Sequence, residues 1–339
     1  MSVTRSDVAR AAGVSPAVVS YVLNGGPRPV SAAARARVEA AIEQLDYRPN
    51  AIASALRGGS TRSVGLLSPD PLDPYFAELA EAIEREFSGA GYVVLTGHGH
   101  GDRAREERYV RTFTARQVDG LVFASVATTS FDGIECPVLV IDGMPSDKPV
   151  STIDVEHAAD AAVAVEHLQR HGHSLIGCIS MPVGTSVGAT SIAGWSAQQA
   201  RDESPAGDEL VAFAESSEEG GNLAAHLLLS EHGRPWAIHG TRPTALFVAA
   251  DVQAIGAIHA CWELGLRVPD DVAIVSIGGT RPAAFTVPPL TTMRQDLPYL
   301  AKRAVKELLR RFEDPSRAPE HTVLRGNLVV GRSCGCELA

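Results

Sequence analysis

The sequence has no long hydrophobic run. None of its 339 residues lies in a stretch approaching the ~20 consecutive apolar residues that a membrane-spanning helix needs, so we expect no membrane partner. The first ten residues, MSVTRSDVAR, are polar and charged where a secretory signal would have its apolar core. We therefore expect a protein that stays in the cytoplasm.

The chain also has few cysteines, and none forms the C-x-x-C spacing of a zinc site or redox motif. The five are widely scattered: Cys136, Cys178, Cys261, Cys334 and Cys336. They indicate reduced thiols, with Cys334 and Cys336 in an exposed tail rather than in a redox or metal site. His98–His100 and His171–His173 lie at expected turns without a cysteine or carboxylate at ligand spacing. We therefore predict no metal and no cofactor.

Positive charge is scarce overall but concentrated at one end. Residues 1–60 contain seven arginines and four acids, a balance of +3 within a net charge of −10, which leaves −13 on the rest of the chain. A small basic segment on an acidic body is expected when only that segment contacts nucleic-acid phosphates.

The basic segment begins with the pattern of three short helices. Thr4, followed by Asp7 three residues later, forms a capping-box arrangement for the first helix. Ser15 can cap a second helix whose first residue is Pro16, and Ser31 can cap a third. The tight turn between the first two helices predicts a helix-turn-helix.

The second helix of this segment has two different faces. At 100° per residue, one arc is apolar: Val18, Val19, Val22 and Leu23. The opposite arc contains small, uncharged and hydrogen-bonding residues: Pro16, Ala17, Ser20, Tyr21 and Asn24. The apolar arc is expected to be core. The other arc suits close approach to the bases in a DNA major groove.

Residues 49–57 contain helix-forming residues but span barely two turns before Gly58 and Gly59. Because so short a helix is unstable alone in water, it needs a partner surface to become ordered. We interpret it as a candidate hinge.

From about residue 62, short apolar runs alternate with longer helical segments. The expected strands are 64–67, 92–96, 120–124, 137–141, 175–180, 245–249 and 272–277. The expected helices are 75–88, 103–114, 158–170, 192–200, 221–229, 252–264 and 297–312. This alternation predicts an α/β fold with parallel sheets covered by helices on both faces, and roughly 270 residues favour two lobes.

Several motifs resemble one known family. Val3–Ala9, Ala12–Ser15 and Tyr47–Asn50 are similar to the head of the lactose/galactose repressor (LacI/GalR) family of bacterial transcription factors. Weaker matches follow in the family's order, among them Pro74-Tyr75-Phe76 and Pro288–Thr292. The resemblance covers nearly the whole chain.

The resemblance implies a helix-turn-helix head, a hinge helix and a body like the two-lobed periplasmic sugar-binding proteins. We expect the DNA-binding head at 1–60, its hinge helix at about 49–57, and the effector-binding and dimerisation body at 61–339. The lobes are expected at about 61–156 with 295–322, and at about 157–294 with 323–339.

By the same resemblance, Pro16, Ala17 and Tyr21 take the positions that read base edges. The residues expected to contact phosphates and position the head are Thr4, Ser15, Ser20, Asn24, Arg28 and Asn50. Leu56, with Ala53, matches the wedge that paired hinge helices insert into the minor groove. Such a wedge requires a homodimer on a pseudo-palindromic operator.

The effector cleft departs from the family's pattern. Sugar-binding members usually have an arginine, an asparagine and an aspartate where this chain has Ser191, Ala250 and Gly278. The remaining cleft candidates are Tyr75, Phe76, Asp142, Ser191, Trp195, Asp251 and Gln295. Two alternatives stay open: a small-molecule effector that is sugar-like but less polyhydroxylated, or a body that responds to no small molecule.

We interpret the chain as a transcriptional regulator, more specifically a repressor, and not as an enzyme. One alternative is a cytoplasmic solute-binding sensor without direct gene regulation. The presence of the DNA-binding head argues against this alternative. A second is a serine hydrolase, because Gly184–Gly188 fits G-x-S-x-G with Ser186 as nucleophile. That motif needs an abrupt strand-to-helix turn, whereas residues 184–190 are expected to continue as loop.

Overall fold

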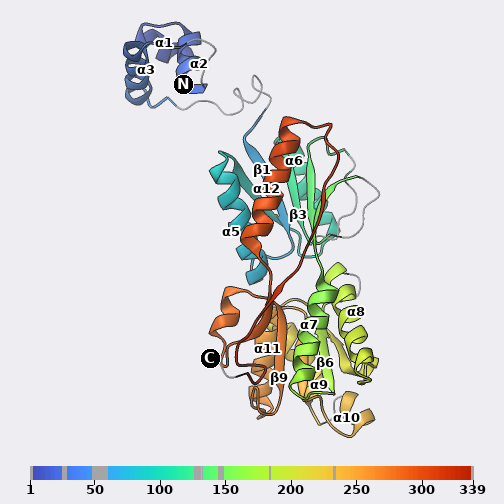
Figure 1. Ribbon diagram of the computed structural model, residues 1–339. Helices are drawn as coiled ribbons and strands as arrows, with labels where there is room; N and C mark the ends of the chain where they lie inside the picture. The colour runs from blue at the N-terminus through green and yellow to red at the C-terminus, as the bar shows by residue number, and fades with distance from the viewer. Residues whose placement is uncertain are drawn as a thin grey trace. The chain divides into compact units, whose positions relative to one another are not determined.

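The computed structural model describes residues 3–24, 29–47, 60–125, 131, 133–143, 149–182, 185–231 and 234–336. The chain forms two compact units, residues 1–61 and 62–339, here called the head and the body (Figure 1). No helix within the described ranges is long and apolar enough to cross a membrane. The expected hinge helix at 49–57, with Ala53 and Leu56, lies outside them.

The head consists of three helices, α1 (Arg5–Ala12), α2 (Pro16–Asn24) and α3 (Ala32–Gln44). The side chain of Thr4 accepts from the amide of Asp7, and the Asp7 carboxylate accepts from the Thr4 amide at 3.0 Å, so the expected capping box is confirmed. These reciprocal bonds satisfy amides that would otherwise have no partner at the start of a helix.

One small apolar core holds the three helices together. Its buried members are Val8, Ala9, Ala12, Val19, Val38 and Ala41. Val19 of α2 has no exposed surface, and Val18, Val22 and Leu23 pack against the same core. The apolar arc of α2 therefore faces inward, as its spacing predicts, while Pro16 and Ala17 are exposed.

The body contains two six-stranded sheets. The first has the order β11-β5-β4-β3-β1-β2, and all its neighbours are parallel. Its strands are β1 (Ser63–Ser68), β2 (Val93–His98), β3 (Gly120–Ala124), β4 (Val138–Ile141), β5 (Ser151–Val155) and β11 (His321–Leu324). One face packs on α5 (Pro74–Gly89) and α12 (Leu297–Glu313), and the other on α6 (Arg103–Ala115).

The second sheet has the order β12-β10-β9-β8-β6-β7, with β12 antiparallel to β10. Its strands are β6 (Ile176–Ser180), β7 (Val211–Phe213), β8 (Ala245–Val248), β9 (Ala273–Gly278), β10 (Thr291–Arg294) and β12 (Asn327–Val329). Two helices cover one face, α7 (His157–Arg170) and α8 (Ser186–Arg201), and two cover the other, α9 (Glu218–Leu229) and α11 (Asp251–Glu263). Short helices η1 (Asp208–Leu210), α10 (Arg234–His239) and η2 (Arg281–Phe285) complete the lobe.

The chain passes between the two sheets three times, after β5, after β10 and after β11. In Figure 1, α12 therefore lies beside α5 in the first lobe although more than half of the chain separates them in sequence. β11 continues to Leu324, so the last crossing comes after Leu324 rather than at the expected 322–323 boundary.

The expected α/β class with two lobes of parallel strands is confirmed. One local prediction is wrong: α8 begins at Ser186, capped by Thr185, rather than continuing as loop to residue 190. The first residues of α8 are Ser-Val-Gly-Ala-Thr, and all of them except Ala have weak helix propensity. The Thr185 hydroxyl, which accepts from the Gly188 amide at 3.0 Å, starts the helix instead.

Two glycines allow α9 and α11 to approach closely. A Cβ at Gly221 of α9 would lie 1.9 Å from the carbonyl oxygen of Gln253, and one at Gly256 of α11 would lie 1.9 Å from that of Glu218. Both obstacles are helix backbone, which cannot rotate away as a side chain could. The packing on this face of the second sheet therefore requires glycine at both positions.

We expect Gly221→Ala to lower the free energy of unfolding by about 1–3 kcal/mol, because the helices must separate to admit the methyl group. Urea denaturation measures this change. Gly89→Ala is the matched control: a Cβ at Gly89, the last residue of α5, meets no atom within 4 Å. Equal stabilities of the two variants would contradict this account of the packing.

Candidate functional site

A cavity of about 610 Å³ lies between the two lobes of the body. Its walls come from the carboxyl ends of strands in both sheets, with Ser125 after β3, Asp142 after β4, Ala249 after β8 and Gly278 at the end of β9. Crevices at the carboxyl ends of parallel strands are the usual ligand sites of such sheets, and this volume suits a small organic molecule.

Two hydrogen bonds join the lobes beside the cavity, and a third joins the first lobe to the crossing between them. Ser216, between β7 and α9, donates to the Asp73 carboxylate at 2.8 Å, and the amide of Arg281 in η2 donates to Glu78 of α5 at 2.7 Å. The Tyr75 hydroxyl donates to Gln295 Oε1 at 2.6 Å. The two lobes are therefore in direct contact beside the cavity in this structure.

Asp73 supports this closure from the first lobe. It caps α5 by accepting from the Tyr75 amide at 2.9 Å, and its other oxygen accepts from Ser216. Burial raises the pKa of the Asp73 carboxyl, although both hydrogen bonds act in the opposite direction. The same carboxylate thus joins the start of α5 to the second lobe.

Asp251 organises the floor of the cavity in the second lobe. Its carboxylate accepts hydrogen bonds from the hydroxyls of Ser276 and Thr292 at one oxygen, at 2.6 and 2.7 Å. The other oxygen accepts from the amide and hydroxyl of Thr280, at 2.7 and 2.8 Å. Burial raises the pKa of Asp251, and these four bonds oppose the rise.

The space beside this carboxylate explains the glycine that follows β9. A Cβ at Gly278, whose φ is +141°, would lie only 2.8 Å from Oδ2 of Asp251. The position where sugar-binding relatives have an aspartate therefore cannot hold a side chain without moving Asp251.

Asp142 and His157 form a buried ion pair in the wall of the cavity. His157 Nε2 lies 3.4 Å from Asp142 Oδ2, and Asp142 Oδ1 accepts from the Val155 amide at 2.7 Å. Neither ring nitrogen of His157, which is 6% exposed, has a hydrogen-bond partner among the described residues. Because Nε2 faces Asp142, Nδ1 is the ring nitrogen with spare capacity to hydrogen-bond a ligand.

The environment favours the protonated form of this histidine. Burial lowers the pKa of His157, but the Asp142 carboxylate, helped by Asp160 and Asp154, outweighs burial and raises the pKa above its ordinary value.

The cavity wall is acidic. Its ionisable residues are Asp70, Asp73, Glu106, Asp142, Glu215, Asp251, His100 and His157, and no Lys or Arg occurs among the described residues that line it. The apolar part of the wall includes Tyr75 and Phe76, whose rings pack edge to face at a centroid distance of 5.2 Å. Such a wall disfavours phosphorylated ligands.

The sequence candidates fall into two groups. Five of them line the cavity: Tyr75, Phe76, Asp142, Asp251 and Gln295. Ser191 and Trp195 lie elsewhere, because both are buried in α8 and Trp195 donates to the carbonyl of Ile176 at 3.2 Å within the core of the second lobe.

Sequence reasoning missed His157, Asp73 and Ser216. Asp73 carried a usable signal, because an aspartate directly before Pro74 at the start of a predicted helix is a capping pattern. His157 lies one residue before the helix expected to begin at 158. The sequence around it has no pattern that indicates its contact with Asp142.

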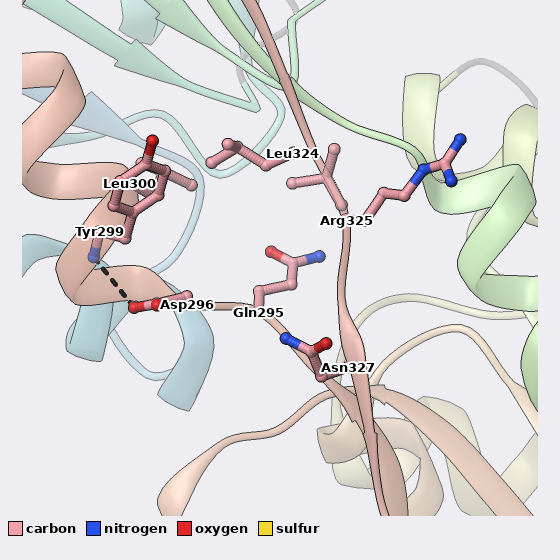
Figure 2. Close-up of a pocket in the computed structure, with 8 residues that line it drawn as sticks. Gln295, Asp296, Tyr299, Leu300, Leu324, Arg325 and Asn327 are labelled. Atoms are coloured by element: carbon pink, nitrogen blue, oxygen red, sulfur yellow. Dashed lines mark hydrogen bonds between the residues drawn. The ribbon is translucent and has the colours of Figure 1, made fainter.

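A smaller cavity of about 190 Å³ lies where the chain crosses between the lobes (Figure 2). Gln295, Tyr299 and Arg325 are among its lining residues, and the dashed line marks the Tyr299 amide donating to Asp296 at 3.0 Å. Gln295 lines both cavities and thus connects the crossing to the larger one.

The head presents a separate candidate surface on α2. Ser15, Pro16 and Ala17 are exposed, and Tyr21 is half-buried without belonging to the apolar core of the head. Ser20 is half-buried on the same helix, and Asn24 ends it. The Thr4 hydroxyl is engaged in the capping box. Arg28, Asn50, Ala53 and Leu56 lie outside the described residues.

The expectation of an exposed cysteine tail is wrong. Cys334 is 1% exposed and packs in the core of the second lobe, because the segment after β12 returns to the sheet instead of leaving it. The amide of Ile274 donates to the carbonyl of Ser333 at 2.8 Å, which fixes this return. His171 also lies 3.2 Å from Cys336 Sγ, so this histidine has a cysteine beside it, contrary to expectation.

The ion pair predicts a pH dependence of stability. Because the folded-state pKa of His157 exceeds its ordinary 6.5, the pair stabilises the fold fully below about pH 6.5, and this contribution disappears as the pH rises through the raised pKa. Urea denaturation at several pH values is therefore expected to show a smaller stability difference between wild type and His157→Gln at high pH. Asp142→Asn should remove the same dependence; a difference independent of pH would refute the pairing.

Comparisons with known protein families find a match for the head and another for the body. Residues 4–50 match the bacterial regulatory proteins of the lacI family, and residues 165–334 match the periplasmic binding protein-like domain. The ribose operon repressor of Escherichia coli (strain K12) is 32% identical over 321 residues, which cover 92% of this chain and 94% of that protein. The HTH-type transcriptional repressor PurR of Yersinia pestis bv. Antiqua (strain Antiqua) is 32% identical and covers 97% and 96%.

Solved structures have a similar fold. The Lac repressor dimer bound to operator and the anti-inducer ONPF has a TM-score of 0.84 at 27% identity, covering 98% of this chain and 99% of that one. The transcriptional regulator CelR in complex with cellobiose has a TM-score of 0.71 at 23% identity, covering 98% and 99%, and supports the fold alone. With a helix-turn-helix head, a two-lobed body and full-length relatives at this identity, the chain belongs to the lacI family of bacterial regulatory proteins.

Proposed function

We propose that the protein is a transcriptional repressor that binds a pseudo-palindromic operator as a homodimer and responds to a small molecule in the cavity between its lobes. The observation that carries this proposal is the combination, in one chain, of an α2 helix with an exposed uncharged face and a body with an interlobe cavity. The working place of such a repressor is the bacterial cytoplasm, where its operator lies.

The head, residues 1–60, is assigned to DNA. On α2, Pro16 and Ala17 offer only apolar contact, such as to a thymine methyl, so the Tyr21 hydroxyl is the group that can hydrogen-bond a base edge. Ser15, Ser20, Asn24 and the basic residues of the head are assigned to phosphates, which set its position without reading sequence. Residues 49–57 are assigned to the hinge helix with its Leu56 wedge.

The body, residues 61–339, is assigned to dimerisation and effector binding. Its exposed large apolar side chains supply material for an interface: Leu223 and Leu227 of α9, Phe285 of η2, and Val287. A repressor dimer among its structural neighbours supports the same assembly here. Two copies match the two half-sites of a pseudo-palindromic operator.

The effector is assigned as a small molecule without phosphate groups that carries several hydrogen-bond donors or a positive charge. The acidic wall repels phosphate, and the Asp142 and Asp73 carboxylates accept hydrogen bonds. His157, cationic when protonated, supplies a donor, and the Tyr75 and Phe76 rings offer a face for an apolar part of the ligand. A relative named for the ribose operon agrees with an uncharged polyol within this class.

The bonds between the lobes link the cavity to the state of the whole body. Asp73, Ser216 and Gln295 line the cavity, and their hydrogen bonds also join the two lobes or join the first lobe to the crossing. A ligand that competes for these hydrogen bonds, or adds new ones across the cavity, therefore changes the free energy of closing the lobes. A ligand that binds closed and open bodies with different affinity shifts the balance between them, and with it the affinity for the operator.

A solute sensor without DNA binding and a serine hydrolase were the alternatives. The presence of the helix-turn-helix head argues against a solute sensor that does not bind DNA. The hydrolase elbow needs strand and helix to meet at the serine, but β6 ends at Ser180 and α8 begins at Ser186. The relatives are named as repressors, and none of those described above as an enzyme.

For DNA binding, we expect purified protein to select one pseudo-palindromic sequence from a random pool, with affinity falling steeply as salt rises because bound phosphates release counterions. Tyr21→Phe should relax selection at one base position in each half-site, at a cost of about 1–3 kcal/mol. Tyr47→Phe is the matched control, since Tyr47 packs against the core of the head. Unchanged selection in Tyr21→Phe would reject the base-reading role, and no selected sequence would reject the proposed function.

For the effector, we expect a thermal-unfolding screen of polyols, amines and sugar phosphates to yield a stabilising compound without phosphate. At one hundred times its Kd, it should add about 2.7 kcal/mol to the free energy of unfolding. Phe76→Ala and His157→Gln should abolish this gain, while Phe213→Ala, a change to an exposed phenylalanine outside the cavity, should keep it. Stabilisation by phosphorylated compounds alone would contradict the assignment.

A further inference from the structure

Two histidines and two cysteines meet at the side of the second lobe, in a part of the molecule that DNA and effector binding do not use. His167 lies in the last turn of α7 and His171 is the residue directly after that helix, while Cys334 and Cys336 lie in the segment that follows β12. Their ligand atoms all lie within 4.8 Å of one another. Four side chains of the types that bind zinc most readily thus come together, although two come from the start of this lobe's sequence and two from its end.

The distances suit a single tetrahedral ion. Cys336 Sγ lies 3.2 Å from His171 Nε2 and 3.7 Å from His167 Nε2. With Zn–S of about 2.3 Å and Zn–N of about 2.0–2.1 Å, tetrahedral ligand atoms are about 3.3–3.8 Å apart. The four side chains therefore need only small adjustments to surround one ion.

The backbone brings both sulfurs to the same place. Only Gly335 separates the cysteines, a shorter spacing than zinc sites usually have, but its φ of +92° turns the chain between them. On α7, residues four apart share one helix face, so His167 and His171 lie one turn above the other with ring centroids 4.9 Å apart.

Neighbouring groups hold the cysteine segment in position. The Thr291 hydroxyl donates to Cys334 Sγ at 3.0 Å and accepts from the Gly331 amide at 2.9 Å. The Ser333 hydroxyl accepts from the Thr291 amide at 2.8 Å and donates to the carbonyl of Ile274 at 2.6 Å. Outer contacts of this kind orient the ligands of zinc sites.

Simple core packing does not account for the cluster. Packing explains Cys334, which is buried, but not the partly exposed Cys336 or the exposed His171, which face each other. Both cysteines are free thiols in this structure.

We propose that His167, His171, Cys334 and Cys336 bind one zinc ion, which fastens the segment after β12 to α7. Four protein ligands complete a tetrahedral shell, so the site is structural and leaves no position for a substrate. The ion would clamp the antiparallel edge strand β12 of the second sheet, next to the last crossing of the chain.

Purified full-length protein tests this directly. After dialysis without chelator, elemental analysis by mass spectrometry is expected to find one zinc ion per chain. Replacement of zinc by cobalt(II) should give the visible absorption of a tetrahedral site together with thiolate-to-cobalt charge transfer. Removal of the ion with a chelator should lower the thermal unfolding temperature, and added zinc should restore it.

His171→Ala and Cys336→Ser are the informative variants, because their side chains are more exposed than Cys334 and the fold should survive, as circular dichroism can verify. Since changes in the outer contacts of a zinc site already cost about 10- to 100-fold in affinity, each ligand variant should lose more than about 100-fold. His173→Ala, whose imidazole faces Thr244, and Cys136→Ser in the first lobe are matched controls that should keep full affinity.

Two results would overturn the proposal. One is wild-type protein that takes up no zinc or cobalt from micromolar solution. The other is zinc that remains bound equally well in His171→Ala and Cys336→Ser, which would place the ion elsewhere. Neither result bears on operator selection, which depends on the head.

Discussion

A single buried carboxylate ties together the part of the body on which the cavity depends. Asp251 begins α11 and accepts four hydrogen bonds from three residues: Ser276 of β9, Thr280 before η2, and Thr292 of β10. An ionised carboxylate removed from water needs such partners, because burial without them would cost several kcal/mol. The four hydrogen bonds of Asp251 therefore hold β9, β10, α11 and the loop before η2 together, and so shape the floor of the cavity.

The charged groups where the two lobes meet behave differently. Asp142 and His157 neutralise each other without a complete set of hydrogen bonds, and Asp73 gives one of its oxygens to the other lobe. Asp251 thus has all its hydrogen bonds inside the second lobe, whereas Asp142, His157 and Asp73 each contact a group in the other lobe. This division allows a ligand to influence closure without disturbing the internal fold of either lobe.

Features determined by local chemistry could be predicted from the sequence. Thr4 and Ser31 as helix caps, Pro16 at the first position of α2 and the apolar arc around Val19 depend on residues a few positions apart. The short strands β10, β11 and β12 carry no such pattern and owe their pairing to neighbours already in place.

The candidate site was predictable only in part, because most of its contacts join residues that are far apart in the sequence. Tyr75 and Gln295 were found by resemblance, but the pairing of His157 with Asp142 and the meeting of His167 with Cys334 depend on chain crossings that no local pattern encodes. Trp195 shows the opposite error, because the family motif predicts this residue in the effector cleft, whereas it packs in the core of the second lobe.

The three crossings also decide the order in which the first lobe can be completed during synthesis. One face of its sheet is covered by α12, whose buried residues include Leu300, Ala304 and Leu308, and its edge is closed by β11. Both are translated after most of the second lobe, of which only β12 and the segment that follows it come later. Until then α5 and the strands beneath it expose apolar surface on the ribosome, so this half of the body depends on protection from chaperones or on rapid folding of its neighbour to avoid aggregation.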